Sequence, residues 1–167
     1  MLPLLSNNLK KLMSMLESKP QTEPASQPFV EDYLAYLLAR SSKLVSEQFH
    51  ATVKAAGINV NYWRILASLS DGDGLTLKQL NKRVLFNQPT LSKLVARMEA
   101  QGLLSRQKDQ QDKRAILIFI TGQGRVLVDD LLAQSKWHEE QVMSDYSMEQ
   151  QALLKDMLRQ LVKTLEP

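Results

Sequence analysis

Two short amphipathic segments separated by a three-residue break constrain the fold of this chain more than any other feature. Thr76 is suited to cap a first helix over residues 77–84, and a second helix opens at Asn87 or Gln88, after a break at 85–87. Two helices joined by so short a connection meet at a tight corner. The pattern therefore predicts a helix-turn-helix.

The second of these helices has one apolar and one polar face. Pro89 lies in its first turn, where the missing N–H is tolerated, and Gly102 ends it. Its apolar residues follow the i, i+3, i+4, i+7 spacing of a buried stripe: Leu91, Leu94, Val95 and Met98. With the apolar stripe buried, the opposite polar side, which carries Lys93 and Arg97, faces solvent.

A polar hairpin is predicted directly after the second helix. Residues 103–108 and 115–120 both suit β-strands, and the second is rich in β-branched side chains. The tip between them, 109–114, is polar and ends in two basic residues. We therefore expect a mainly α fold with a small β-wing, that is, a winged helix-turn-helix core flanked by N- and C-terminal dimerisation helices.

Helical patterns continue on both sides of this core. Apolar residues recur at helical spacing over 29–56, over 60–69 after Asn59, from Gly122 to about Ser144, and from the cap at Ser147 to Leu165. Residues 1–18 predict an amphipathic helix, and residues 19–28, with three prolines, predict a linker. Residues 29–167 then form a single domain, with a DNA-binding part at about 60–122 and dimerisation parts at about 29–56 and 123–165.

Basic residues are concentrated in the predicted helix-turn-helix and wing. Between Lys78 and Arg114 there are nine basic and three acidic residues, a net charge of +6 in a chain whose total is only +3. Such a segment is typical of binding to the phosphate backbone of nucleic acid. A solvated basic face is the alternative, and charge alone does not separate the two.

The winged helix-turn-helix suggests which side chains would contact duplex DNA. A major groove about 12 Å wide admits one helix, and a neighbouring β-ribbon can reach the adjacent minor groove. Arg106 and Asp112 are assigned a supporting role, with Asp112 expected to pair with Arg114 or Arg106 and hold the hairpin in shape. The expected DNA contacts are Gln88, Pro89, Thr90, Ser92, Lys93 and Arg97 on the helix, and Lys113 and Arg114 on the wing.

The segment from Leu75 to Gly124 resembles the winged-helix core of the multiple-antibiotic-resistance regulator (MarR) family. The resemblance rests on the order and spacing of several pieces: Leu77-x-x-Leu80, Thr90-Leu91-Ser92-Lys93-Leu94-Val95-x-Arg97-Met98-Glu99, Gly102-Leu103-Leu104-x-Arg106, Asp112-Lys113-Arg114 and Ile120-Thr121-x-x-Gly124. It implies a transcriptional regulator, a homodimer on a pseudo-palindromic operator, usually a repressor released by a small phenolic or lipophilic ligand. Residues 1–27 extend beyond the usual family start. Asp-Lys-Arg replaces the common Asp-Arg-Arg, which keeps the charge and loses a planar guanidinium.

Two further sets of residues have both a functional and a purely structural interpretation. The resemblance places three aromatic or histidine side chains near a ligand cleft: Tyr36, His50 and Trp63. Aromatic residues at helical spacing usually belong to the core, and this is the alternative interpretation. Apolar residues at near-heptad spacing in the terminal segments predict a dimer seam, with an intramolecular stripe as the alternative. These dimerisation residues are Leu5, Leu9, Leu12, Leu16, Leu154, Met157, Leu158, Leu161 and Leu165.

Several classes of function are disfavoured by what the sequence lacks. The 167 residues include no cysteine, and His50 and His138 lack metal-ligand spacing, so we expect no metal and no cofactor. No Ser/His/Asp set or carboxylate pair stands out, so we expect no enzyme. No apolar run is long enough to span a bilayer, and we expect a cytoplasmic protein with no membrane partner. The alternatives to a ligand-responsive repressor are a winged-helix protein-interaction module and a ligand-independent activator.

Overall fold

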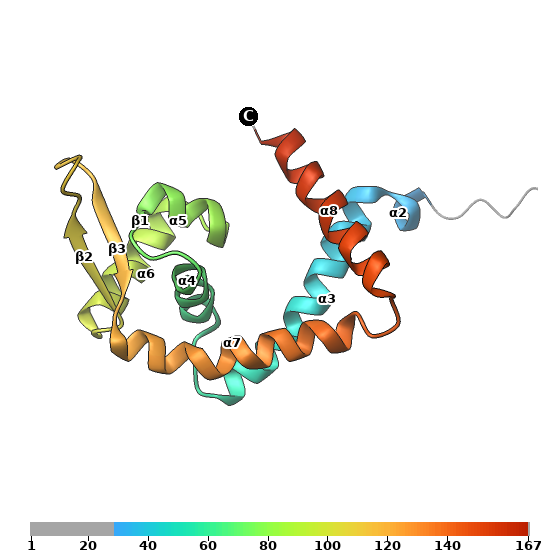
Figure 1. Ribbon diagram of the computed structural model, residues 1–167, viewed down its shortest axis with the longest axis horizontal. Coiled ribbons are helices and arrows are strands. Elements are labelled where there is room, and N and C mark those ends of the chain that lie inside the picture. Colours follow the sequence, from blue (N-terminus) through green and yellow to red (C-terminus); the bar gives the residue numbers. More distant parts are fainter. Residues whose placement is uncertain (1–28, 167) are drawn as a thin grey trace, which may run out of the picture. The chain divides into compact units, whose positions relative to one another are not determined.

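The computed structural model of the chain describes residues 29–166 (Figure 1). The chain divides into two compact units, residues 1–42 and 43–167. The predicted helix at 1–18, with Leu5, Leu9, Leu12 and Leu16, and the predicted linker at 19–28 lie outside the described residues.

The described part of the first unit is helical but not one continuous helix. A short helix, α2 (Phe29–Asp32), is followed by Tyr33 and then by α3 (Leu34–Ala55), whose second half belongs to the second unit. The Tyr33 amide donates to the Val30 carbonyl three residues back, which tightens the turn, and the rings of Phe29 and Tyr33 stack 5.5 Å apart. The single helix expected over 29–56 is therefore interrupted at Tyr33.

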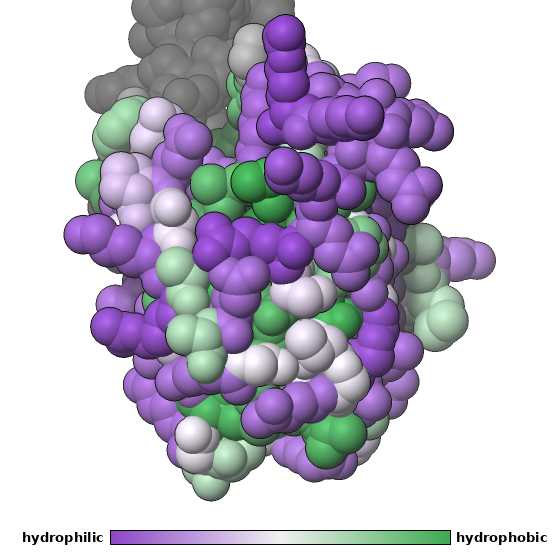
Figure 2. All heavy atoms as spheres, turned by 90° about the vertical axis from the view of Figure 1, so that its left-hand side faces the viewer, coloured by the Kyte–Doolittle hydropathy of each residue, from purple (hydrophilic) through white to green (hydrophobic). Residues whose placement is uncertain are grey.

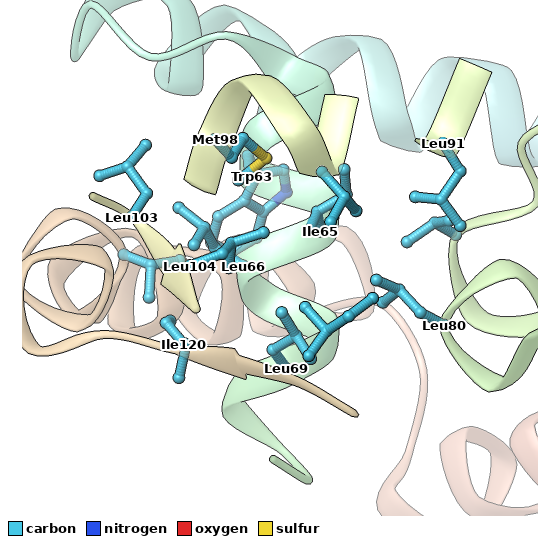
Figure 3. Close-up of a cluster of buried hydrophobic side chains, with 14 of the residues drawn as sticks. Trp63, Ile65, Leu66, Leu69, Leu80, Leu91, Met98, Leu103, Leu104 and Ile120 are labelled. Carbon is cyan, nitrogen blue, oxygen red and sulfur yellow. The ribbon is translucent and has the colours of Figure 1, made fainter. Parts of the chain in front are cut away.

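The core of the second unit is organised around helix α4 (Val60–Ser70). Asn59 caps it, because its side chain accepts a hydrogen bond from the Asn61 amide. Trp63, Ile65, Leu66 and Leu69 of α4 point into a cluster with Leu80, Leu91, Met98, Leu103, Leu104 and Ile120 (Figure 3). This cluster fixes the elements that carry the polar surface described below.

The predicted helix-turn-helix is present, and Thr76 caps its first helix as predicted. Helix α5 (Leu77–Val84) starts in a capping box between Thr76 and Gln79, and α6 (Gln88–Ala100) starts at Asn87, whose side chain accepts from the Thr90 amide. Between the two helices Leu85 has a φ of 56°, in the left-handed region. We refer to residues 84–86 as the corner and to α6 as the recognition helix.

The wing is part of a three-stranded antiparallel sheet in the order β1-β3-β2. Strands β2 (Leu104–Lys108) and β3 (Ile116–Ile120) form the predicted hairpin, each one residue shorter than expected. Strand β1 (Leu75–Thr76) pairs with Ile118 and Leu117 and was not predicted, since two residues are too few to show a period. The structure thus confirms a mainly α fold with a small β-wing.

Two long helices complete the second unit. Helix α7 (Gly122–Val142) is capped by Thr121. Helix α8 (Met148–Leu165) is capped by Ser147, as the sequence predicts, in a capping box with Gln150. A side chain on Gly124 would place its Cβ 2.4 Å from the Leu103 carbonyl oxygen, so only glycine lets α7 approach the sheet this closely. In the described residues no helix is both long and apolar enough to cross a membrane.

Candidate nucleic-acid interface and neighbouring cavity

The recognition helix buries one face and exposes the other, as its sequence predicts. Leu91, Val95 and Met98 lie in the core, and Leu94 packs against it. Pro89 and the Asn87 cap fix where the helix begins, so the phase of the exposed face is set by local interactions. The six residues predicted to contact DNA from this helix are all exposed: Gln88, Pro89, Thr90, Ser92, Lys93 and Arg97.

The wing presents its two basic tip residues to solvent on an ordered turn. Lys113 and Arg114 are both exposed. The turn is held by the Asp109 carboxylate, which accepts from the Gln111 amide at 2.9 Å, and by the Ala115 amide, which donates to the Asp112 carbonyl at 2.8 Å. Figure 2 shows the face of the protein that contains the wing, where hydrophilic side chains predominate and apolar ones lie between them.

The partners of the two supporting residues differ from those expected. Asp112 Oδ1 accepts from the backbone N–H of Arg114 at 3.0 Å, rather than pairing with the side chain of Arg114 or Arg106. An aspartate two residues before a backbone amide closes a tight local turn, and this geometry leaves the Arg114 guanidinium free of that carboxylate. Asp112 therefore shapes the wing tip through the backbone.

Arg106 joins the wing to the recognition helix. Its guanidinium donates to the Glu99 carboxylate of α6, from Nε at 2.7 Å and also from Nη2. This hydrogen bond from Arg106 lowers the pKa of Glu99 below its ordinary value and raises that of Arg106. The pairing was not predicted, because a seven-residue separation across a helix end and a strand has no sequence signature.

Asp73 is a second anchor that the sequence analysis missed. Its Oδ1 accepts from the Ile120 amide at 2.8 Å, and its Oδ2 pairs with Arg125 Nη2 at 2.8 Å. One carboxylate thus holds the end of β3 and the first turns of α7 together. In the sequence, Asp73 lies within Asp-Gly-Asp-Gly, which indicates only a turn.

A cavity of about 510 Å³ lies among α3, α4, α7 and α8 of the second unit. His50 and Trp63 line it, whereas Tyr36, the third predicted pocket residue, belongs to the first unit, where its hydroxyl accepts from Arg40. Half of the lining residues are apolar and half are polar or charged: Val45, Ser46, Phe49, His50, Trp63, Arg64, Ser135, His138, Glu139, Val142, Met143, Leu154, Lys155 and Leu158.

Aromatic and basic side chains meet in this cavity. The Phe49 ring lies 5.2 Å from Trp63 and 5.5 Å from His138, measured between ring centroids. Burial, followed by the positive charges of Arg64 and Lys54, lowers the pKa of His50. Lys155 is paired with Glu139. The cavity is thus suited to a small molecule that has an apolar body and an acid group.

Helix α8 exposes much of its apolar side within the described chain. Of the predicted dimerisation residues, Met157 and Leu165 are 61% and 73% exposed, Leu154 and Leu158 are less so, and Leu161 is half-buried. Met148, Leu153 and Val162 add to this surface. An apolar face this large is unusual on a monomer and typical of an interface.

A helix-turn-helix with an exposed polar recognition helix and a basic wing defines a DNA-binding winged-helix protein. Comparison with known proteins agrees with this class: a protein-family model described as MarR family matches residues 56–115. The organic hydroperoxide resistance transcriptional regulator of Bacillus subtilis is 30% identical over 98 residues, which cover 59% of this chain and 67% of that protein. The chain belongs to the MarR family of transcriptional regulators.

Solved structures extend the likeness over most of the chain. A MarR family transcriptional regulator from Silicibacter pomeroyi superposes with a TM-score of 0.74 at 36% identity, covering 84% of this chain and 100% of that one. NadR, solved in complex with 4-hydroxyphenylacetate, superposes with a TM-score of 0.71 at 26% identity, covering 77% of this chain and 91% of that one.

Proposed function

We propose that this regulator is a homodimeric repressor that binds a pseudo-palindromic DNA operator and is released by a small acidic ligand. The observation that carries the proposal is the exposed polar face of α6, with Lys93 and Arg97, on a helix whose opposite face packs into the core. A rigid helix end of this kind fits a major groove and can hold its long cationic side chains against bases or phosphates.

The wing supplies the second proposed contact of each subunit. Lys113 and Arg114 stand at the tip of a hairpin that the Glu99–Arg106 pair ties to the recognition helix. Basic side chains at such a tip suit the minor groove beside the major-groove site, where a narrow groove concentrates negative potential. The helix and wing would therefore bind adjacent grooves on one side of the duplex.

Dimerisation is proposed through the exposed apolar side of α8. The family relationship supports a dimer in general, and the exposure of Met157 and Leu165 supports this surface. Two recognition helices would then need a separation of about 34 Å to enter successive major grooves. Repression requires only occupancy of the operator, which is why a small dimer with these parts suits it.

The ligand is proposed to occupy the cavity beside α4. Support comes from its size, its apolar lining and its basic side chains, and from NadR, whose structure holds 4-hydroxyphenylacetate. A ligand that favours a dimer with the wrong helix spacing can lower DNA affinity by at most its preference for that state. Release from DNA would therefore follow occupancy of the cavity.

The experiment starts from genomic fragments selected by the purified protein and measures their affinity in rising salt. A repressor of this design binds a selected duplex with a steep inverse dependence of affinity on salt, because each neutralised phosphate releases counterions. Absent or salt-insensitive binding would contradict the proposal and favour a winged-helix module that docks on protein. A reporter driven by the selected site, with lower output when the regulator is present, separates repression from activation.

A further inference from the structure

Arg64 lies where the cavity and the helix-turn-helix meet. It is one of the cavity-lining residues of α4, and its positive charge contributes to the lowered pKa of His50 across the cavity. Its guanidinium also reaches the corner between α5 and α6. There Nη2 donates to the Val84 carbonyl at 2.5 Å, and Cζ lies 4.6 Å from the centroid of the Phe86 ring.

The corner that Arg64 holds is strained. Leu85 has a φ of 56°, a conformation that costs energy for a bulky side chain, and it is 80% exposed, so burial does not compensate for it. The residues on either side supply the support: Val84 is buried, Phe86 packs against the core, and both contact Arg64. Strained backbone persists where its surroundings over-determine it.

The position of the corner sets the start of the recognition helix. Asn87, the cap of α6, follows Phe86 directly. A shift of Phe86 is therefore passed to the first turn of α6, which carries Gln88 and Thr90. A side chain that is displaced from its contact position loses hydrogen bonds to DNA. The contacts of Arg64 with the corner should therefore affect DNA affinity.

The present partners of Arg64 leave its charge available to an acidic ligand. The Val84 carbonyl and the Phe86 ring are both neutral, and within residues 29–166 Arg64 forms no ion pair. The lysine that lines the cavity, Lys155, is already paired with Glu139. A carboxylate binds guanidinium more strongly than a carbonyl does, often through two parallel hydrogen bonds. A carboxylate in the cavity would therefore compete for Arg64.

We propose that Arg64 is the positioning residue that couples the cavity to the recognition helix. The acid group of a bound ligand draws the guanidinium away from the Val84 carbonyl and the Phe86 ring, the strained corner relaxes, and DNA affinity falls. This rests on the proposed function, and it adds which residue transmits the signal and why the ligand must be an acid. By linkage, operator DNA weakens ligand binding by the same factor.

The test uses 4-hydroxyphenylacetate as the acidic probe and its neutral amide as the matched control. The full chain carries Trp137→Phe, so that Trp63, in the cavity wall, is its one remaining tryptophan and reports probe binding. The quantity measured is the coupling factor, the ratio of operator Kd at saturating probe to operator Kd without it. For the parent chain we expect a factor of at least about five with the acid and about one with the amide.

Three variants then distinguish a residue that couples probe binding to DNA affinity from one that only supports the fold. Arg64→Lys keeps a charge for the acid but lacks the planar group that spans a carbonyl and a ring, so probe binding persists while the coupling factor falls toward one. Phe86→Leu, outside the cavity lining, raises the operator Kd without probe and leaves the Kd at saturating probe unchanged. Arg83→Lys is the control, because Arg83 clamps α5 to the Ser68 carbonyl at 2.7 Å without lining the cavity, and it keeps the parent factor.

Each result decides between the inference and its alternatives. If a substitution of Arg64 or Phe86 raises the operator Kd by the same factor with and without probe, that residue has a structural role only. An unchanged coupling factor in both variants overturns the inference. Failure of the acid to bind, or an equal effect of the amide, overturns it as well. If the parent chain binds no duplex at all, the proposed function itself is wrong. Thermal unfolding of each variant checks that it is folded.

Discussion

Arg106 of β2 and Glu99 of α6 are joined by a hydrogen-bonded ion pair, with Nε 2.7 Å from the carboxylate, at the surface outside the core. The pair fixes the wing relative to the C-terminal end of the recognition helix. Because both side chains are partly exposed, its contribution to stability is modest, and its main effect is on orientation.

Glu99→Gln should weaken operator binding by a few-fold while leaving the fold intact. Since hydrogen bonding to Arg106 holds the pKa of Glu99 below its ordinary 4.5, the ionised carboxylate stabilises the folded state above that pH. That stabilisation is lost as pH falls through the lowered pKa. Urea denaturation of both proteins should therefore give a small difference in unfolding free energy at pH 7 that disappears in acid. A difference that grows in acid would contradict the assignment.

Gly124→Ala should destabilise the second unit by about 1–3 kcal/mol, because its Cβ would lie 2.4 Å from the Leu103 carbonyl oxygen and 2.9 Å from Ile120 Cγ1. Gly122→Ala is the matched control, two residues earlier at the start of the same helix, with nothing within 4 Å of its Cβ. Chemical denaturation should show a loss for the first and none for the second. Equal effects would mean that helix propensity, not close packing, explains Gly124.

Leu85→Asn should raise the unfolding free energy by up to about 1 kcal/mol, since asparagine tolerates the left-handed region that costs leucine energy. The exposed Leu85 side chain loses little packing in the exchange. Val126→Asn, at an equally exposed position of helix α7, controls for the polarity of the new side chain and should not stabilise. Destabilisation by Leu85→Asn would show that the leucine side chain has a partner.

Met157→Glu should shift the protein from dimer to monomer without unfolding it. Met157 is 61% exposed in the described chain, so a charge there is tolerated in the monomer but costly in an apolar seam. Lys163→Glu, on the same helix, is the control for a new acidic residue. Sedimentation equilibrium distinguishes the outcomes, and a dimer of unchanged stability would place the interface elsewhere.

The helices and the hairpin could be predicted from the sequence because their signals are local. Thr76, Asn87 and Ser147 cap helices through residues three positions away, and the apolar stripe of α6 sets its exposed face. The interactions that were missed join distant parts of the chain. Asp73 reaches Ile120 and Arg125, and Arg64 reaches Val84 and Phe86, so neither role has a signature within one window of sequence.

The cavity shows the same difference between local signals, which the sequence reveals, and long-range packing, which it does not. His50 and Trp63 could be selected as aromatic or titratable residues on the relevant helices, and both line it. Tyr36 met the same criterion but belongs to the first unit, so its place beside the cavity stays a prediction. The break at Tyr33 was equally invisible in a continuous helical pattern.

The central claim is that α6 and the wing contact operator DNA, and the salt dependence of operator affinity in single variants tests it most directly. Lys93→Ala and Arg114→Ala should each weaken binding, because each removes one cationic contact. Each should also make the plot of the logarithm of the DNA association constant against the logarithm of the salt concentration less steep, by about one unit. Lys163→Ala, which removes the same charge from α8, should leave the slope at the parent value. Equal slopes for all three variants would contradict the claim.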